Sequence, residues 1–326
     1  MKSDRKRRVK SQDRRVRTGL GPANSDPTKL SRLRTEQSNS AAHDLDRKSS
    51  LEIARLMNAE DATVATAVVR VLPEIARAID LVASALRRGG RLIYVGAGTS
   101  GRIAALDAAE CSPTFNTDRV QFIIAGGLKA LAYDSEISED DARQGRDEMA
   151  RRKPGKRDVV LGIAASGRTP FTLAAIKVAR RGGARTIALT CNPKSPLERA
   201  AHFAIVVQVG PEVLAGSSRM KAATAHKMVL NIISTGAMSR LGYVYGNLMV
   251  NVVPKNEKLR QRALGILERA SGAHSAAARS ALEASGDRTP VALVMLIAGV
   301  TRAEALIALK KSLGHVRDAI ALAGAK

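Results

Sequence analysis

Aromatic residues and cysteines are scarce in this 326-residue chain. Phe, Trp and Tyr together make up 2% of it, Trp is absent, and Cys111 and Cys191 are its two cysteines. Two cysteines are too few for a disulfide framework, so we expect a protein of the reducing cytoplasm. Because aromatics are rare, the 45% of the chain that is hydrophobic must build its core from Ala, Val, Ile and Leu. Such residues suit helices packed closely on a parallel sheet.

Long apolar runs and metal-ligand clusters are also missing. The longest apolar run, VALVMLIAGV at 291–300, is far shorter than the ~20 residues of a membrane helix. The basic N-terminus has no apolar segment of the kind found in secretory signals. No two of the five histidines flank a carboxylate at a spacing of four, and there is no C-x-x-C motif. We therefore expect no membrane segment, no metal site and no cofactor.

The positive charge of the chain, +23 overall, is unevenly distributed. Residues 1–34 contain 12 basic and 3 acidic residues and almost no apolar periodicity, which predicts a disordered basic tail. The tail lacks the interleaved aromatics that stack on bases, so we expect nucleic acid to make at most nonspecific contact with it. The rest of the chain still has a net charge of +14, which favours anionic substrates.

Apolar runs alternate with helical patterns through the middle of the chain. Helical spacing over 44–61 and 62–90 comes first, and further helices are expected near 100–110, 138–152, 170–182 and 218–240. The runs between them are continuously apolar, as in strands buried on both faces: 91–96, 121–126, 158–165, 184–190 and 203–209. This order predicts a doubly wound α/β fold, with a mainly parallel sheet flanked by helices, over 35–255. Short helical patterns without strands then predict a small all-helical C-terminal unit over 256–326.

Two loops rich in glycine and hydroxyl groups follow the first and third predicted strands. One offers Thr99 and Ser100, and the other offers Ser166, Gly167 and Thr169, each at the start of a helix. Backbone amides at helix starts bind phosphate, and the carboxyl ends of parallel strands meet at one edge, so one phosphate between both loops is expected. Simple N-caps and tight turns would have the same residues. The first loop also matches G-x-G-x-x-G, but no acidic residue follows the next strand, which favours a monophosphate over a dinucleotide.

A third loop, GSSRMK at 216–221, supplies further candidates for substrate binding. They are Ser217, Ser218, Arg219 and Lys221, and the alternative is a capped helix with solvated charges. Among the acidic residues, Glu110 has small and apolar neighbours that predict partial burial, which suits a proton-transferring carboxyl group. Pro113 is predicted to end its helix. A second carboxylate is expected at 133–145, where the pattern does not choose among four residues: Glu136, Glu139, Asp140 and Asp141.

Five ordered motifs give the chain a specific resemblance. They are VGAGTSGR, LDAAECSPT, GIAASGRTP, GSSRMKAATAHK and GNLMVNVVPKNEKLR, preceded by TEQSNSAAHDLDRKSSLEIARLMNAED at 35–61. From residue 35 to the C-terminal helices the sequence resembles the N-acetylmuramic acid 6-phosphate etherases, a family with a sugar isomerase (SIS) domain. The family usually has Ser where Ala109 stands and Pro where Ser112 stands. Neither position supplies a proton, so these departures leave the expected activity unchanged.

The resemblance implies a reaction and the residues that perform it. The D-lactyl ether at C3 of N-acetylmuramic acid 6-phosphate is eliminated and water adds back, which yields N-acetylglucosamine 6-phosphate and D-lactate in cell-wall amino-sugar recycling. The family's first catalytic glutamate falls on Glu110, as the acid for the leaving ether oxygen. The second falls on Glu139, with Glu136 as the alternative because that segment aligns less tightly. The phosphate-binding hydroxyls fall on Ser100, Ser166 and Thr169, with Thr99 adjacent. A homodimer is also implied, with sites that two subunits can complete together.

Three other functions share these loops. A sugar-phosphate-binding regulator related to the glucokinase regulatory protein would keep the hydroxyl loops but would not need both glutamates. A SIS-type transcription regulator would need a helix-turn-helix unit, and residues 1–34 are too polar and unpatterned to form one. An aldose–ketose isomerase would share the phosphate loops and a base at C2 but would release no lactate. The DAAECSPT segment around Glu110 favours the etherase.

Overall fold

A parallel five-stranded sheet forms the centre of the computed structural model, which describes residues 33–133 and 136–325. The strand order is β2-β1-β3-β4-β5. The strands are β1 (Leu92–Gly96), β2 (Val120–Ile124), β3 (Val159–Ile163), β4 (Arg185–Thr190) and β5 (Phe203–Val206). Each coincides with one of the five apolar runs, which confirms the predicted doubly wound sheet. Of the predicted basic tail, residues 1–32 lie outside the described residues.

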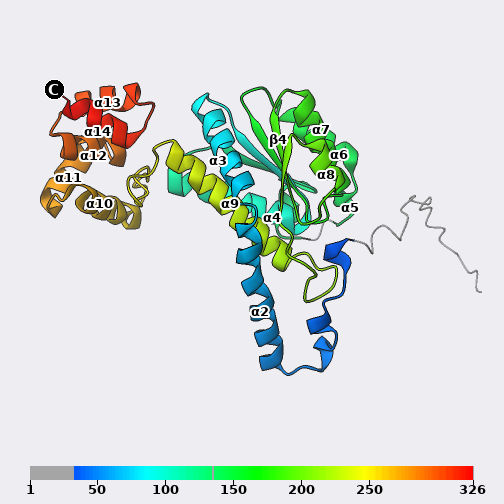
Figure 1. Ribbon diagram of the computed structural model, residues 1–326. Coiled ribbons are helices and arrows are strands. Elements are labelled where there is room, and N and C mark those ends of the chain that lie inside the picture. Colours follow the sequence, from blue (N-terminus) through cyan, green and yellow to red (C-terminus); the bar gives the residue numbers. More distant parts are fainter. Residues whose placement is uncertain (1–32, 134–135, 326) are drawn as a thin grey trace, which may run out of the picture.

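Helices cover both faces of this sheet (Figure 1). One face packs against α3 (Leu72–Arg87), α4 (Gly98–Phe115) and α9 (Lys221–Arg240). The other face packs against α6 (Ala142–Arg151), α7 (Pro170–Arg181) and α8 (Pro196–Ala200). The sequence predicted all of these except α8, which is a single short turn. Pro196 begins α8, and the Ser195 hydroxyl accepts a hydrogen bond from the Glu198 amide at 3.2 Å.

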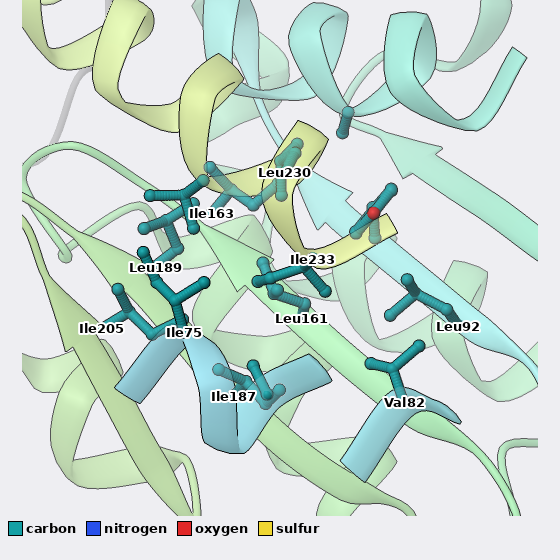
Figure 2. Packing of buried hydrophobic residues seen from close by; sticks show 14 of the residues in the cluster. Ile75, Val82, Leu92, Leu161, Ile163, Ile187, Leu189, Ile205, Leu230 and Ile233 are labelled. Carbon is teal, nitrogen blue, oxygen red and sulfur yellow. The ribbon is translucent and has the colours of Figure 1, made fainter. Parts of the chain in front are cut away.

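Aliphatic side chains fill the layer between the sheet and α3, α4 and α9, as the composition predicts. Figure 2 shows this packing, with side chains of α3, α9 and the strands interdigitating. The labelled residues are Ile75, Val82, Leu92, Leu161, Ile163, Ile187, Leu189, Ile205, Leu230 and Ile233. Continuous burial of β1 and β3 explains why their sequences are apolar at every position rather than alternating.

The N-terminal elements lead into a long helix that projects from the sheet (Figure 1). Three 3₁₀ turns, η1 (Arg34–Glu36), η2 (Ser40–Ala42) and η3 (Leu45–Arg47), precede α2 (Ser50–Val69). The helix predicted over 44–61 thus begins later than expected, because Ser49 and Glu52 form a capping box. Most of α2 is exposed, and its buried residues are Val64, Ala67 and Val68.

The C-terminal helices form a second core of their own. They are α10 (Glu257–Ser271), α11 (Ser275–Ala284), α12 (Thr289–Ala298), α13 (Arg302–Lys311) and α14 (Val316–Gly324). Their apolar side chains pack against one another and against Val250 and Val252, and the unit lies apart from the sheet (Figure 1). Within the described ranges, no single helix has the length and apolarity to cross a membrane; α12 and α13 meet that test only as a pair bent by 107°.

The strand order creates a crevice at one edge of the sheet. β1 and β3 are neighbours, but α4 follows β1 on one face and α7 follows β3 on the other. The chain therefore departs in opposite directions from two adjacent carboxyl ends, which is where open α/β sheets bind ligands. After β2, the short elements η4 (Gly127–Leu131) and α5 (Glu136–Glu139) lead to α6.

Candidate functional site

A cavity of about 290 Å³ opens at the carboxyl ends of β1 and β3. Both predicted phosphate loops line it, together with a carboxylate-bearing segment and the N-terminal turn η1. The lining residues are Thr35, Glu36, Ala97, Gly98, Thr99, Ser100, Arg102, Glu136, Glu139, Ile163, Ala164, Ala165, Ser166, Thr169 and Ser218. Residues far apart in the sequence thus share one polar cavity at the expected edge of the sheet.

The first wall is the start of α4. Ala97 is the N-cap residue, so the amides of Gly98, Thr99 and Ser100 lie in the first turn, where a helix offers them no acceptor of its own. Gly98 has a φ of +49°, a conformation that favours glycine. The positive end of the helix dipole and two hydroxyl groups therefore face the cavity, an arrangement that suits a phosphate.

The second wall is the loop between β3 and α7. Ser166 and Thr169 line the cavity, and the Ser166 hydroxyl accepts a hydrogen bond from the Arg168 amide at 3.2 Å. Thr169 precedes α7, but its side chain does not cap that helix. Gly167 shapes the turn with a φ of +67°, and an added Cβ there would collide with Ser195. Gly167 is thus placed to hold the loop rather than to line the cavity.

Two carboxylates from the segment after β2 complete the cavity. Glu136 and Glu139 open and close α5, and both line the cavity. Glu139 lies against the start of α4, where a Cβ on Gly98 would collide with its Oε1. Arg102 ties this segment to α4, because its guanidinium donates hydrogen bonds to the carbonyls of Ala130 at 2.9 Å and Tyr133 at 2.8 Å. A carboxylate thus lies beside the two predicted phosphate loops.

Glu110 does not lie in this cavity. It is exposed on α4, about 18 Å further along the helix axis than Gly98. The expectation of partial burial is therefore wrong for the subunit, because the small neighbours Ala108 and Cys111 turn to the core while Glu110 turns to solvent. Pro113 does not end the helix either. It lies in the last turn, and the helix continues to Phe115, with the Asn116 amide donating to the Ser112 carbonyl.

The third loop contributes less to the cavity than its sequence suggests. Ser218 lines it, whereas Ser217 does not and Arg219 is exposed. Lys221 is buried, with an ion pair from its Nζ to the Glu60 carboxylate of α2. Its ammonium group therefore ties two helices together rather than pointing into the cavity.

A buried glutamate holds the start of α9. The Glu212 carboxylate accepts hydrogen bonds from the amides of Lys221 at 2.8 Å and Ala222 at 2.9 Å. Burial raises the pKa of Glu212, and these amides oppose that rise. The first turn of α9 is therefore occupied by the protein's own carboxylate.

Thr35 and Glu36 also line the cavity, although the sequence did not indicate them as site residues. Asn192 holds this turn, because it accepts from the Arg34 amide at 3.0 Å and its Nδ2 donates to Thr35 Oγ1 at 3.2 Å. The Gly216 amide donates to the Thr35 carbonyl at 3.2 Å. The TEQSN stretch at 35–39 was the available signal, but nothing in its local pattern places it beside β3.

Metal-ligand geometry is absent from the described part of the chain. Over residues 33–133 and 136–325, no group of three or more His, Cys, Asp or Glu side chains is arranged to hold a metal ion. The cavity instead offers hydroxyl groups, helix-start amides and carboxylates. Such a site can bind an anion and transfer protons.

Two family models match the central part of the chain, and named relatives match most of it. The model of the SIS domain matches residues 147–235, and that of the glucokinase regulatory protein N-terminal SIS domain matches residues 74–180. An N-acetylmuramic acid 6-phosphate etherase of Symbiobacterium thermophilum is 54% identical over 83% of this chain and 91% of its own. Another, of Edwardsiella ictaluri, is 48% identical over 89% of this chain and 98% of its own. Among solved structures, a phosphoheptose isomerase from Francisella tularensis is 19% identical with a TM-score of 0.48, over 59% of this chain and 100% of that one.

Proposed function

Because the chain belongs to the family of N-acetylmuramic acid 6-phosphate etherases, we propose that it cleaves the D-lactyl ether of that sugar phosphate. The products are N-acetylglucosamine 6-phosphate and D-lactate, and we place the reaction in cytoplasmic recycling of cell-wall amino sugars. The observation that supports this best is one cavity that unites the α4 start, the β3 loop and the Glu139 carboxylate. Phosphate binding and proton transfer are the two capacities that the reaction needs.

The 6-phosphate binds between the two loops in this proposal. Thr99, Ser100, Ser166 and Thr169 donate hydroxyl hydrogen bonds to it, and the α4 amides add theirs. With the phosphate held there, the sugar carbons extend across the cavity toward α5. Glu139, which lies beside the start of α4, is then placed near C2, and Ser218 lines the same space.

The reaction needs two carboxyl groups because protons move at two places, at C2 and at the ether oxygen on C3. In the open-chain sugar, the C2 proton is acidic because it is α to the C1 aldehyde, and Glu139 removes it. The C3–O bond then breaks, and Glu110 gives its proton to the departing lactate oxygen, which leaves an unsaturated aldehyde. Water then adds at C3, where Glu110 takes one of its protons, and Glu139 returns a proton to C2. Both carboxyl groups regain their starting states, so the overall reaction is a hydrolysis of the ether. General acid–base steps of this kind contribute about 10²–10⁴-fold each.

Two subunits are needed to bring both carboxyl groups to one sugar. Glu139 lies at the start of α4, and Glu110 is about 18 Å further along the helix axis. Glu139 must come within about 3 Å of C2, and Glu110 must come within about 3 Å of the ether oxygen on C3. We therefore infer a homodimer in which the exposed Glu110 of one subunit enters the cavity of the other. An isologous two-fold interface would complete both sites at once.

Lactate release tests the activity directly. Purified protein is mixed with N-acetylmuramic acid 6-phosphate, and D-lactate is measured with a lactate dehydrogenase. Glu110→Gln and Glu139→Gln are each expected to lower the rate by about 10²-fold or more while the fold is retained. Glu136→Gln, one turn away, separates the two candidates of α5. Glu148→Gln, at a half-buried carboxylate that pairs with Arg151 outside this cavity, is the control that should retain the rate.

The outcome also distinguishes the regulatory alternative. The match to the glucokinase regulatory protein model is the observation that favours this alternative. The highly similar relatives, in contrast, are named as etherases. A folded protein that binds the sugar phosphate without releasing lactate would support the regulator. A Glu110→Gln variant with the wild-type rate would remove Glu110 from the mechanism.

A further inference from the structure

A buried histidine lies directly behind the phosphate-binding hydroxyl of Ser100. His226, in the second turn of α9, is 1% exposed. Its Nδ1 is 3.4 Å from Ser100 Oγ, and its Nε2 is 3.7 Å from the sulfur of Cys191, which follows β4. The imidazole thus bridges a cavity residue and a thiol buried in the core. The proposed mechanism gives this bridge no role.

Burial determines the protonation states along the bridge. Desolvation lowers the pKa of His226 to about 4, so the imidazole is neutral near pH 7 and only one of its nitrogens has a proton. Desolvation, with a smaller effect of the Glu212 charge, raises the pKa of Cys191 well above its ordinary value. The thiol therefore keeps its proton and acts as a weak donor.

The bound phosphate decides which nitrogen has the proton. A phosphate ester near pH 7 mainly accepts hydrogen bonds, so the single proton of the Ser100 hydroxyl must point toward it. The Ser100 oxygen is then an acceptor toward the imidazole, which requires a proton on Nδ1 of His226. A bare Nε2 remains, and the Cys191 thiol can donate to it. The opposite tautomer would draw the Ser100 proton away from the phosphate and present oxygen lone pairs to an anion.

We propose that His226 is a positioning residue that orients the Ser100 hydroxyl toward the phosphate. The hydrogen bonds run in one direction: Cys191 S–H to Nε2, Nδ1–H to Ser100 Oγ, and Ser100 O–H to the phosphate. The proposal rests on the proposed function in one respect, the binding of the 6-phosphate by Ser100. It adds a determinant of phosphate affinity that lies outside the cavity wall.

Binding of N-acetylglucosamine 6-phosphate tests the proposal without requiring turnover. By titration calorimetry, Ser100→Ala and His226→Phe are each expected to weaken binding about tenfold or more, since a hydrogen bond to a charged group is lost or misdirected. The double variant should bind no more weakly than either single one, because both changes remove the same bond. His226→Asn, whose amide can donate from the position of Nδ1, should stay within about threefold of wild type. His202→Phe, at the far edge of the sheet beside Thr186, is the control.

The tautomer itself is measurable in the unmodified protein. Nitrogen-15 NMR of histidine-labelled protein, saturated with N-acetylglucosamine 6-phosphate, should show His226 protonated at Nδ1, and Cys191→Ser should preserve that state. An Nε2-protonated ring, or additive losses in the double variant, would overturn the proposal even if His226→Phe failed to fold. Wild-type protein that binds no sugar phosphate would contradict the proposed function instead. If the wild-type protein binds the sugar phosphate and a folded His226→Phe variant binds it equally well, only the role of His226 is contradicted.

Discussion

Gly98 shows how a single residue joins the first glycine-hydroxyl loop to the α5 segment. Its φ of +49° starts α4 in the required direction, and the missing Cβ leaves the space that the Glu139 carboxylate occupies. The glycine is therefore needed for two reasons, backbone conformation and close approach of a second chain segment. Only the first of these is visible in the G-x-G-x-x-G spacing.

Gly98→Ala is expected to impair catalysis more than stability. The new Cβ would displace Glu139, the proposed base, so the rate of lactate release should fall by about 10²-fold. The free energy of unfolding should fall by only about 1 kcal/mol, which is the usual cost of alanine at a positive φ. Displacement of Glu139 adds little to this cost, because its carboxylate is the flexible end of a side chain. The rate and the urea midpoint are measured on the same preparation.

Gly127→Ala is the matched control for this prediction. Gly127 also has a positive φ, +67°, but nothing lies within 4 Å of the position of an added Cβ. Its stability should fall by a similar amount while its rate stays near wild type. Equal rate losses in both variants would show that backbone strain, and not the contact with Glu139, controls activity.

At the scale of elements, an ion pair fastens the starts of two adjacent strands. Arg91 precedes β1 and Asp158 precedes β3. Asp158 Oδ1 accepts from the Arg91 amide at 2.9 Å, and Oδ2 accepts from Arg91 Nη2 at 2.8 Å and from the Gly155 amide at 3.0 Å. Burial alone would raise the pKa of Asp158, but Arg91 and Gly155 outweigh it, so the pKa is below its ordinary value.

The stabilisation by this pair should depend on pH in a defined direction. A carboxyl group whose pKa is lowered by folding stabilises the protein above its unfolded pKa, about 3.9, and this contribution is lost as the pH falls through the folded pKa. Asp158→Asn is therefore expected to cost about 2 kcal/mol of unfolding free energy at pH 7 and less at pH 3. Urea unfolding at both pH values measures the difference.

Asp118→Asn provides the comparison for Asp158→Asn. Asp118 also lies just before a strand, β2, but it is exposed. Its replacement should change the unfolding free energy by less than about 0.5 kcal/mol at either pH. A cost for Asp158→Asn that is independent of pH would mean that lost packing, rather than lost charge, destabilises the variant.

At the scale of the whole molecule, the homodimer that we propose would make activity a property of the assembly, because Glu110 lies outside the cavity of its own subunit. Each site would take Glu139 from one subunit and Glu110 from its partner, so the two inactive variants can complement each other. When Glu110→Gln and Glu139→Gln proteins are unfolded together and refolded as a mixture, half of the dimers are heterodimers. Each heterodimer has one intact site, so lactate release should return to about a quarter of the wild-type rate.

Refolding each variant alone is the control for this experiment, and it should give no recovery. A mixture as inactive as its components, with heterodimers shown by mass, would mean that each subunit uses its own two glutamates. The Glu110-bearing helix would then have to move relative to the cavity. The projecting helix α2 and the exposed face of α4 are the surfaces on which a second subunit can pack.

How much was predictable differs between the fold and the site. The five strands were predictable because burial on both faces demands apolar residues at every position. The meeting of the two glycine-hydroxyl loops was predictable because parallel strands place their carboxyl ends at one edge. The end of α4 beyond Pro113 and the late start of α2 were not, since helix ends depend on individual capping residues and not on periodicity.

The sequence by itself determined the sheet, the two glycine-hydroxyl loops and the pair of candidate segments for the carboxylates, because each depends on local periodicity or spacing. Only the tertiary structure decided which of the candidates meet. It brought Glu139 to Gly98, brought Thr35 and Glu36 to the cavity, buried Lys221 against Glu60 and left Glu110 on the surface. These outcomes depend on contacts between segments far apart in the chain, and local sequence patterns do not predict such contacts.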